Sequence, residues 1–486
     1  MVLPFLIVGI LASFALILPG IGFFYKGFKN THGWILSLIA LLASLALLLT
    51  PPAYSLIQDQ TISFTPSLTF DSLGIFFSIA MLMVSVFVVF SSYEFMKKEG
   101  NIAQYYSLIL FSSAGMVLIA FSMDLLLLFI AWELMTIPTF VLAGFNKKAF
   151  ESNEAAVKYF VLGTLSTGIL LYGISLVYGL TGTLQLNEIF KILSQRALVD
   201  PLSLLASSLL IAGFGLKMAI VPFHMWIPDT YEGAPTTVST FLAAGTKKAG
   251  FAAALRVFLI ALPLKGLLNE WSLTFAFLAI ITMTLGNIAA LTQGNILRLL
   301  AYSSIAQAGY ILIVFAIANG GTKALELGVS GALFHVLNHA IMKSAAFLVA
   351  ALVIQHSGRA DLDYYNGFSN RAPLTAFNFT IALLALAGVP PLSGFWSKFL
   401  LFTAAIEANM IWLALAGIVN TALSLAYYAL IIKRMYIDEP QDNVKMPQPL
   451  AYTFILTLST ILIMFFGLFP DIVISYTQEA AKALIP

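Results

Sequence analysis

Ionisable side chains occur inside long apolar segments of this chain, where a charge is costly. Glu133 lies in LLLLFIAWELMTIPTF, Lys217 lies in IAGFGLKMAIVPF, and Lys398 follows a Pro-Pro pair. A charged side chain at the centre of a bilayer costs about 2.5 to 3.5 kcal/mol on insertion scales, so such residues usually mark a functional site. Burial disfavours the charged form of a lysine, so a buried amine can both accept and release a proton. These residue types therefore favour proton transfer.

Two further groups of bases lie in apolar segments. LFHVLNHAIMKSAAF places His335, His339 and Lys343 at positions i, i+4 and i+8, which share one helical face. FLAAGTKKAGFAA contains the adjacent pair Lys247 and Lys248. Because consecutive helical residues point about 100° apart, we expect only one of these lysines to face a common seam, and we choose Lys247.

The imbalance between acids and bases indicates how such groups would work. One acid faces at least four mid-membrane bases, so some lysines must be hydrated or spend part of their time neutral. We expect Glu133 to switch the proton affinity of Lys217 by pairing with it, although a static ion pair that only holds helices together is an alternative. These basic side chains are unsuitable ligands for Na⁺, because Na⁺ prefers oxygen ligands. The expected lateral proton path, bridged by water, runs through Glu133, Lys217, Lys247, His335 or His339, Lys343 and Lys398.

Three ionisable residues lie nearer to the ends of apolar segments. We expect Lys158 and Arg256 to extend toward the lipid headgroups, as long basic side chains do. His224, in PFHMWIPD, is either a structural group at a helix break or a proton uptake site. Lys158 and His224 complete the set of candidate residues.

The composition requires a membrane environment for these groups. Hydrophobic residues form 60% of the 486 residues and Asp, Glu, Lys and Arg only 9%, against about 25% charged residues in soluble domains. A net charge of +2 gives no basic field for nucleic acid. The sequence contains no cysteine, which excludes disulfides and thiolate-ligated metals. We expect neither a cofactor nor a metal in this chain, so any redox chemistry belongs to partner proteins.

Apolar stretches of about 20 residues, the length of a membrane-spanning helix, recur throughout. The predicted fold class is all-α, a polytopic membrane protein of about fourteen spans. The gaps 51–69, 181–200 and 354–372 are predicted loops, with an interfacial helix or a plain surface loop over 186–198. The predicted spans are 2–24, 33–50, 70–93, 103–121, 123–145, 156–180, 201–222, 235–262, 271–291, 296–319, 325–353, 373–404, 408–432 and 449–474.

Prolines interrupt the seventh and twelfth spans. Pro222 and Pro228 occur in LKMAIVPFHMWIPD, and Pro390 and Pro391 in LAGVPPLSGFWSKF, so an unbroken helix is unfavourable there. Each break falls on the fourth helix of a five-helix unit, and an odd number of helices inverts the second unit relative to the first. Broken helices in inverted repeats mark transport sites near the bilayer midplane, although two unrelated kinks are an alternative. The predicted divisions are 1–100 (three helices), 101–262 (first repeat), 263–437 (second repeat) and 438–486 (a C-terminal helix).

Positive charges favour one orientation, because basic loops remain in the cytoplasm. The even-numbered connections hold only Lys191, Arg196, Lys265 and Lys323. We therefore expect the odd-numbered connections inside and both termini outside a prokaryotic cell membrane. The odd-numbered connections hold Lys26, Lys29, Lys97, Lys98, Lys147, Lys148, Arg298, Arg359, Arg371, Lys433, Arg434 and Lys445.

Several motifs together resemble the antiporter-like subunits of respiratory complex I and related complexes. The resemblance covers about residues 70 to 440 and is closest to the N-type subunit through PFHMWIPDTYEGAPT. Lys398 agrees with the N and L types, where the M type has Glu. The remaining motifs are AWELMTIPTFVL, AVKYFVLG, LTQGNILRLLAYSSIAQAGYIL, LFHVLNHAIMKSAAF and GVPPLSGFWSKFLLF.

The resemblance implies fourteen helices, two inverted five-helix repeats and no cofactor, with proton translocation driven by electron transfer to quinone elsewhere in a complex. Its central axis falls on Glu133, Lys217, Lys247 and Lys398. The implied partners are neighbouring antiporter-like subunits and a quinone-site module, and the electron donor could be NADH, reduced F420 or ferredoxin.

One departure from many N-type chains leaves the parent complex open. The face of His335, His339 and Lys343 is more similar to L- and M-type subunits, membrane-bound hydrogenases or multisubunit Na⁺/H⁺ antiporters. An ion-exchange subunit of such an assembly is the alternative function. A passive scaffold is a third hypothesis, and an autonomous solute carrier is the least favoured.

Overall fold

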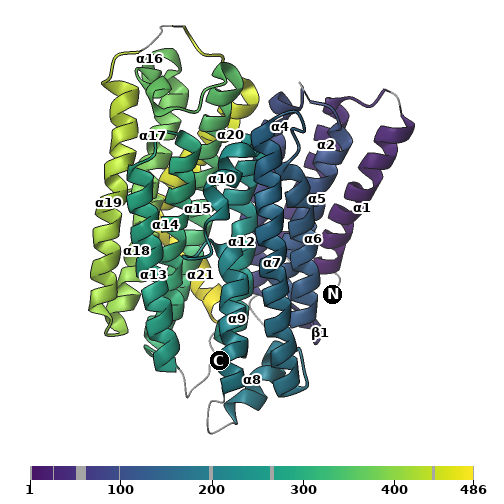
Figure 1. The fold of residues 1–486 in the computed structure, drawn as a ribbon, viewed down its shortest axis with the longest axis vertical. Coiled ribbons are helices and arrows are strands. Elements are labelled where there is room, and N and C mark those ends of the chain that lie inside the picture. Colours follow the sequence, from purple (N-terminus) through teal and green to yellow (C-terminus); the bar gives the residue numbers. More distant parts are fainter. Residues whose placement is uncertain are drawn as a thin grey trace.

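The computed structural model describes residues 3–25, 27–50, 62–97, 99–195, 201–262, 268–440 and 444–484. Within these ranges, 12 helices are long and apolar enough to cross a membrane. Most run roughly parallel, with α1 at one edge and α19 at the other (Figure 1). The predicted all-α membrane fold is confirmed, and several of the fourteen predicted spans are divided into shorter helices.

In its described residues, the N-terminal segment contains three long helices and a small hairpin. Residues 51–61 of the predicted loop 51–69 lie outside the described residues, whereas the rest of it forms an antiparallel hairpin in which Ile62 pairs with Phe70. The hairpin precedes Asp71, whose carboxylate accepts a hydrogen bond from Gly74 N and caps the following helix. The elements are α1 (Leu3–Phe24), α2 (Asn30–Leu48), β1 (Ile62–Thr65), β2 (Leu68–Phe70) and α4 (Ser72–Met96).

The first five-helix unit contains the first interrupted helix. The predicted seventh span divides after Met218, as its prolines require, and resumes at Trp226. The predicted eighth span contains two π-helical stretches, which were not predicted from the sequence. The elements are α5 (Ile102–Phe121), α6 (Leu125–Ala143), α7 (Phe150–Thr181), α8 (Leu186–Ser194), α9 (Pro201–Met218), α10 (Trp226–Gly233), α11 (Thr236–Thr240), η1 (Phe241–Thr246), α12 (Lys247–Arg256) and η2 (Val257–Ala261).

The second unit contains the other interrupted helix, which ends at Ala387 and resumes at Ser393. The predicted fourteenth span also divides, at Pro470, into α20 and α21. The elements are α13 (Leu268–Leu291), α14 (Ile296–Ala316), α15 (Thr322–Ser357), η3 (Leu362–Tyr365), α16 (Phe368–Arg371), α17 (Pro373–Ala387), α18 (Ser393–Glu407), α19 (Ile411–Tyr436), α20 (Leu450–Leu468) and α21 (Pro470–Ala481).

Corresponding helices of the two units pack in the same way. In the first unit α5 packs on α6, and α7 packs on both halves of the interrupted helix, α9 and α10; in the second α13 packs on α14, and α15 packs on both halves, α17 and α18. Glycines permit the first contact in both units, since a Cβ on Gly115 would lie 2.8 Å from Ala131 O and one on Gly286 would lie 2.6 Å from Ala306 N. The repeated packing supports the prediction of two units.

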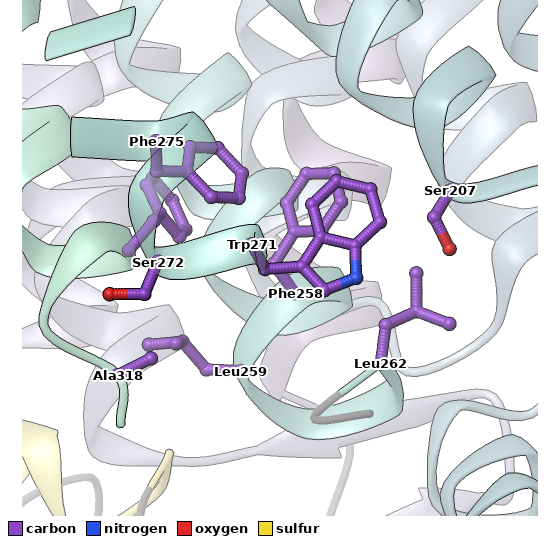
Figure 2. A pocket seen from close by; sticks show the side chains of 9 residues that line it. Ser207, Phe258, Leu259, Leu262, Trp271, Ser272, Phe275 and Ala318 are labelled. Carbon is purple, nitrogen blue, oxygen red and sulfur yellow. The ribbon is translucent and has the colours of Figure 1, made fainter. Parts of the chain in front are cut away.

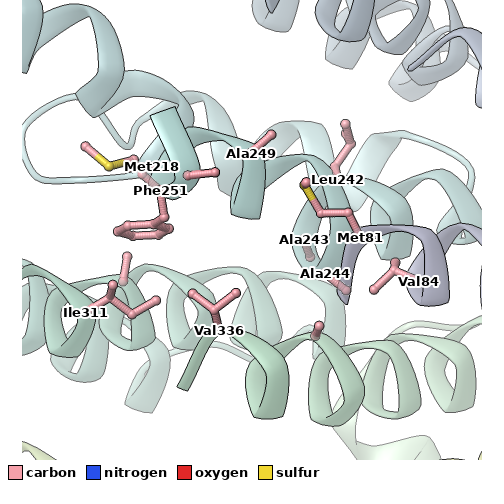
Figure 3. Packing of buried hydrophobic residues seen from close by; sticks show 14 of the residues in the cluster. Met81, Val84, Met218, Leu242, Ala243, Ala244, Ala249, Phe251, Ile311 and Val336 are labelled. Carbon is pink, nitrogen blue, oxygen red and sulfur yellow. The ribbon is translucent and has the colours of Figure 1, made fainter. Parts of the chain in front are cut away.

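The N-terminal segment packs against the first unit and the long helix α15. Met81 and Val84 of α4 lie beside Leu242 and Ala244 of η1 in the buried core (Figure 3). The apolar core therefore reaches the π-helical stretch that directly precedes Lys247.

The two ends of the molecule differ in what they contain. Both termini lie toward the end that carries β1 and α8, and α16 lies at the opposite end (Figure 1). This agrees with an even number of crossings between the termini, whereas the side of the membrane that each end faces stays a prediction. Lys26, Lys98, Arg196 and Lys265, four of the residues that predict it, lie outside the described residues.

Candidate functional site

Six of the predicted bases, together with Lys248, are buried around α9, α12, α15 and α18. The exposed fraction of each side chain in this group is 3% or less. Glu133 on α6 is only partly buried. The structure thus places the predicted bases inside the protein and not toward lipid. The buried bases are Lys217, Lys247, Lys248, His335, His339, Lys343 and Lys398.

Lys217 occupies the last turn of α9, next to the break. Its Nζ donates to the hydroxyl of Tyr159 on α7 at 2.6 Å. The Glu133 carboxylate instead accepts from Thr167 Oγ1 at 3.0 Å, and no ion pair joins it to Lys217 within the described ranges. The static ion pair considered from the sequence is therefore not seen in this structure.

Tyr159 was not among the predicted residues, although it directly follows Lys158 in AVKYFVLG. Its hydroxyl contacts both Lys217 Nζ and, at 3.0 Å, Thr139 Oγ1 on α6. Tyr159 thus links the helix that carries Lys217 to the helix that carries Glu133.

Lys247 and Lys248 begin α12 and reach different helices. Lys247 Nζ donates to Ser304 O at 2.6 Å on α14, whereas Lys248 Nζ is hydrogen-bonded to His339 Nδ1 on α15. The expectation that Lys248 points away from the bases was wrong, because α12 meets polar partners in two directions. Lys248 is therefore added to the candidate site.

The three bases on one face of α15 contact three different elements. His339 meets Lys248, and His335 Nδ1 is 3.0 Å from Ser397 Oγ on α18. Lys343 Nζ donates to Ser303 Oγ at 2.7 Å and to Leu300 O at 2.8 Å on α14. The predicted shared face is confirmed, and it brings both five-helix units into contact.

The two imidazoles have free polar atoms inside the protein. The Nε2 atoms of His335 and His339 have no hydrogen-bond partner among the described residues, and the ring centroids are 6.2 Å apart. A lysine ammonium has donors only, so Nδ1 of His339 accepts from a charged Lys248 and Nε2 carries the hydrogen. Both Nε2 atoms can take part in transfer through water.

Lys398 lies at the second interrupted helix. Its Nζ donates to Leu386 O at 3.1 Å and Ala387 O at 3.2 Å, the last carbonyls of α17, and lies 4.5 Å from the ring centroid of Tyr310. The final carbonyls of a helix lack intrahelical partners and favour a positive charge. The break therefore creates the binding position of this ammonium group.

Lys158 and His224 lie outside this buried group. Lys158 forms ion pairs with Glu154 and Asp229, both at 2.7 Å, and 43% of its side chain is exposed. His224, between α9 and α10, is buried, and its Nδ1 has no partner among the described residues.

Arg256 corrects another expectation. It does not extend toward headgroups: its side chain is buried, forms an ion pair with Asp71 at 2.7 Å, and donates to Ala120 O at 2.7 Å. The pair joins α12 to the start of α4 and the end of α5. Its partner Asp71 lies at the start of the predicted span 70–93 and is 185 residues away in sequence, so the pairing could not be predicted from either segment.

A small cavity elsewhere does not belong to the site. It measures about 30 Å³ and lies between α9, η2, α13 and α14, with Phe258, Trp271 and Phe275 in its wall (Figure 2). None of the residues that line it is titratable, so it offers no proton-transfer group.

The buried bases can relay protons only with the help of water. Among these titratable groups in the described chain, Lys248 and His339 alone are directly bonded to each other. Most of the lysines donate to carbonyl or hydroxyl oxygens, which stabilise an ammonium without cancelling its charge. A hydrogen bond through a bridging water molecule is energetically nearly as favourable as a direct one.

Residues 122–424 match the family model described as NADH:quinone oxidoreductase/Mrp antiporter, TM. The chain belongs to this family. The F(420)H(2) dehydrogenase subunit N of Methanosarcina mazei is 41% identical over 477 residues, covering 94% of each chain. The NADH-quinone oxidoreductase subunit N of Trichlorobacter lovleyi is 41% identical over 428 residues, covering 87% of this chain and 86% of the relative.

Solved structures agree with this membership. A chain of respiratory complex I from Thermus thermophilus superimposes with a TM-score of 0.80 at 32% identity, covering 96% of this chain and 98% of that one. The Mrp complex from Dietzia contains a chain with a TM-score of 0.87 at 20% identity, covering 100% and 98%, which shows a shared fold. The similarity to complex I antiporter-like subunits predicted from the motifs is confirmed.

Proposed function

We propose that this chain is an N-type, proton-translocating subunit of a redox-driven membrane complex that reduces a quinone. The observation that carries the proposal is the buried group of bases, from Lys217 to Lys398, held by carbonyls, hydroxyls and imidazoles. Relatives named as subunit N of NADH-quinone oxidoreductase and of F(420)H(2) dehydrogenase support the type of complex.

In this proposal the chain moves protons and carries out no redox chemistry itself. Its partners are other membrane subunits, including neighbouring antiporter-like subunits and a quinone-site module, in a prokaryotic cell membrane. The sequence divisions at 1–100, 101–262, 263–437 and 438–486 are the proposed functional units, with the proton path crossing from the first repeat to the second.

An ion-exchange subunit of a multisubunit Na⁺/H⁺ antiporter is the second candidate, favoured by the shared fold with the Mrp complex. Identification of the proteins that copurify with the intact chain separates the two. Iron–sulfur and quinone-site subunits are expected for the redox complex, whereas copurification with antiporter subunits alone would overturn that assignment.

The proposed site is tested with Lys217→Ala and Glu133→Gln in the assembled complex. Loss of a proton-transfer group typically lowers the rate by a factor of about 10² to 10⁴, so proton uptake into vesicles should fall at least tenfold while assembly persists on native gels. Lys148→Ala, at an exposed lysine outside the spans, is the control. Full proton uptake by both site variants would remove these residues from the path.

A further inference from the structure

A network of charges connects the two five-helix units at one end of the buried site. The carboxylate of Asp229, on α10, accepts from Lys158 Nζ of α7 at 2.7 Å and from Arg298 NH1 of α14 at 2.8 Å. Arg298 also pairs with Glu232 of α10 at 2.8 Å. Since α7 and α10 belong to the first unit and α14 to the second, Asp229 is shared between the units.

The contribution of this network to stability is modest. About a third of the Asp229 and Arg298 side chains is exposed, and exposed ion pairs contribute little. Its importance lies in the residues to which it is connected.

One connection leads from Asp229 to Lys217 through Trp226, one turn earlier on α10. The Trp226 indole donates to Leu216 O at 2.9 Å, directly before Lys217 in sequence. The indole also stacks on Tyr159, with ring centroids 4.5 Å apart and an interplanar angle of 12°. Tyr159 accepts from Lys217 Nζ, so Trp226 contacts both the backbone that carries this lysine and the phenol that binds its ammonium.

The other connection leads into the second unit. Arg298 lies in the first turn of α14, whose next residues include the acceptors of two buried lysines. Ser303 Oγ accepts from Lys343, and Ser304 O accepts from Lys247. Arg298 therefore lies on the helix that binds both Lys247 of the first unit and Lys343 of the second.

We propose that Asp229 is a positioning residue: by bridging Lys158 and Arg298 it fixes α10 against both units and, through Trp226, holds Tyr159 and Lys217 at proton-transfer distance. This rests on the function proposed above. Asp229 itself takes no part in proton transfer. A displacement of about 1 Å can lower the rate of a positioned reaction by up to about 10²-fold.

The experiment uses the assembled complex in vesicles, with NADH and reduced F420 as electron donors. Proton uptake, measured by quenching of an acridine dye, is divided by the rate of electron transfer. We expect Asp229→Asn to lower this ratio by roughly tenfold, and Asp229→Glu to restore most of it. Glu154→Gln is the matched control, because it removes the other carboxylate on Lys158 without separating the units.

A second pair of variants distinguishes positioning from general destabilisation. Trp226→Phe retains a ring for stacking but loses the hydrogen bond to Leu216 O. If Asp229 acts through Trp226, Asp229→Asn combined with Trp226→Phe should lower the ratio no further than the stronger single variant. If the two substitutions lower the ratio independently, so that their fold losses multiply, the route through Trp226 is overturned.

The outcomes also separate this inference from the proposed function. Lys217→Ala is measured in the same preparation: if it loses proton uptake while Asp229→Asn keeps the wild-type ratio, the positioning role is wrong and the function stands. If Lys217→Ala keeps full uptake, Lys217 is not on the proton path, and the proposed site is overturned together with the positioning role. Should Asp229→Asn fail to assemble, Arg298→Gln, which leaves the Lys158 pair intact, carries the test, and a wild-type ratio there overturns the inference.

Discussion

The buried lysines of the site are held by oxygen atoms and nitrogen atoms that carry no full charge. Lys247 and Lys398 donate to main-chain carbonyls, and Lys248 bonds to an imidazole. A carboxylate partner would stabilise the ammonium form strongly and retain its proton. Neutral acceptors solvate the charge less strongly, which suits a group that must release a proton as well as bind one.

Lys248 provides a prediction at this scale. In Lys248→Met the Nδ1 of His339 loses its donor, so we expect proton uptake by the complex to fall by a factor of about 10 or more, in the range of a lost proton-transfer group. Lys147→Met, at an exposed lysine outside the buried site, serves as control. Wild-type uptake by Lys248→Met, together with loss in Lys247→Met, would support the original expectation that Lys247 alone faces the path.

Residue types and helical spacing predicted most of the buried bases, because an ionisable residue in an apolar segment is conspicuous. Pairing was less predictable. Arg256 was expected at the headgroups, yet it pairs with Asp71, 185 residues away in sequence. Sequence position along a span does not show which neighbouring helix lies within reach.

At the scale of elements, helix breaks create binding positions for the bases. Lys217 lies beside the end of α9, and Lys398 occupies the carbonyl end of α17. Proline predicted both breaks, since it removes a backbone donor and clashes with the preceding turn. The π-helical stretch η1 before Lys247 was not predicted, because FLAAGT contains no residue that favours it over an α-helix.

Close packing of α5 on α6 provides a prediction for an element. A methyl group on Gly115 would meet the backbone of α6, with Ala131 O at 2.8 Å, and overpacking typically costs about 1 to 3 kcal/mol. We expect Gly115→Ala to lower the thermal midpoint of the purified complex. Gly168→Ala is the matched control: it lies in helix α7 with nothing within 4 Å of the added Cβ, so it should not destabilise the complex. Equal midpoints for both variants would contradict the close approach.

For the whole molecule, the two units form one buried row of bases because α14 and α15 of the second unit contact lysines of the first. His339 meets Lys248 of the first unit, while His335 meets Ser397 of the second. The motifs placed these residues on one face of a helix, but they could not show that this face lies at the boundary between the units. That arrangement depends on the packing of helices far apart in sequence.

The orientation of the molecule in the membrane yields the last prediction. Lys147 lies in an odd-numbered connection and Lys191 on α8 in an even-numbered one, and both side chains are exposed. Since the sequence contains no cysteine, Lys147→Cys and Lys191→Cys each introduce a single thiol. If basic loops remain inside, a membrane-impermeant maleimide should label only Lys191→Cys in intact cells and both variants after permeabilisation. Labelling of both variants in permeabilised cells serves as the control, because it shows that no partner subunit covers either site. If Lys147→Cys is then labelled preferentially in intact cells, the predicted orientation is inverted. The side of the membrane from which Lys158 and Asp229 are accessible is then inverted as well.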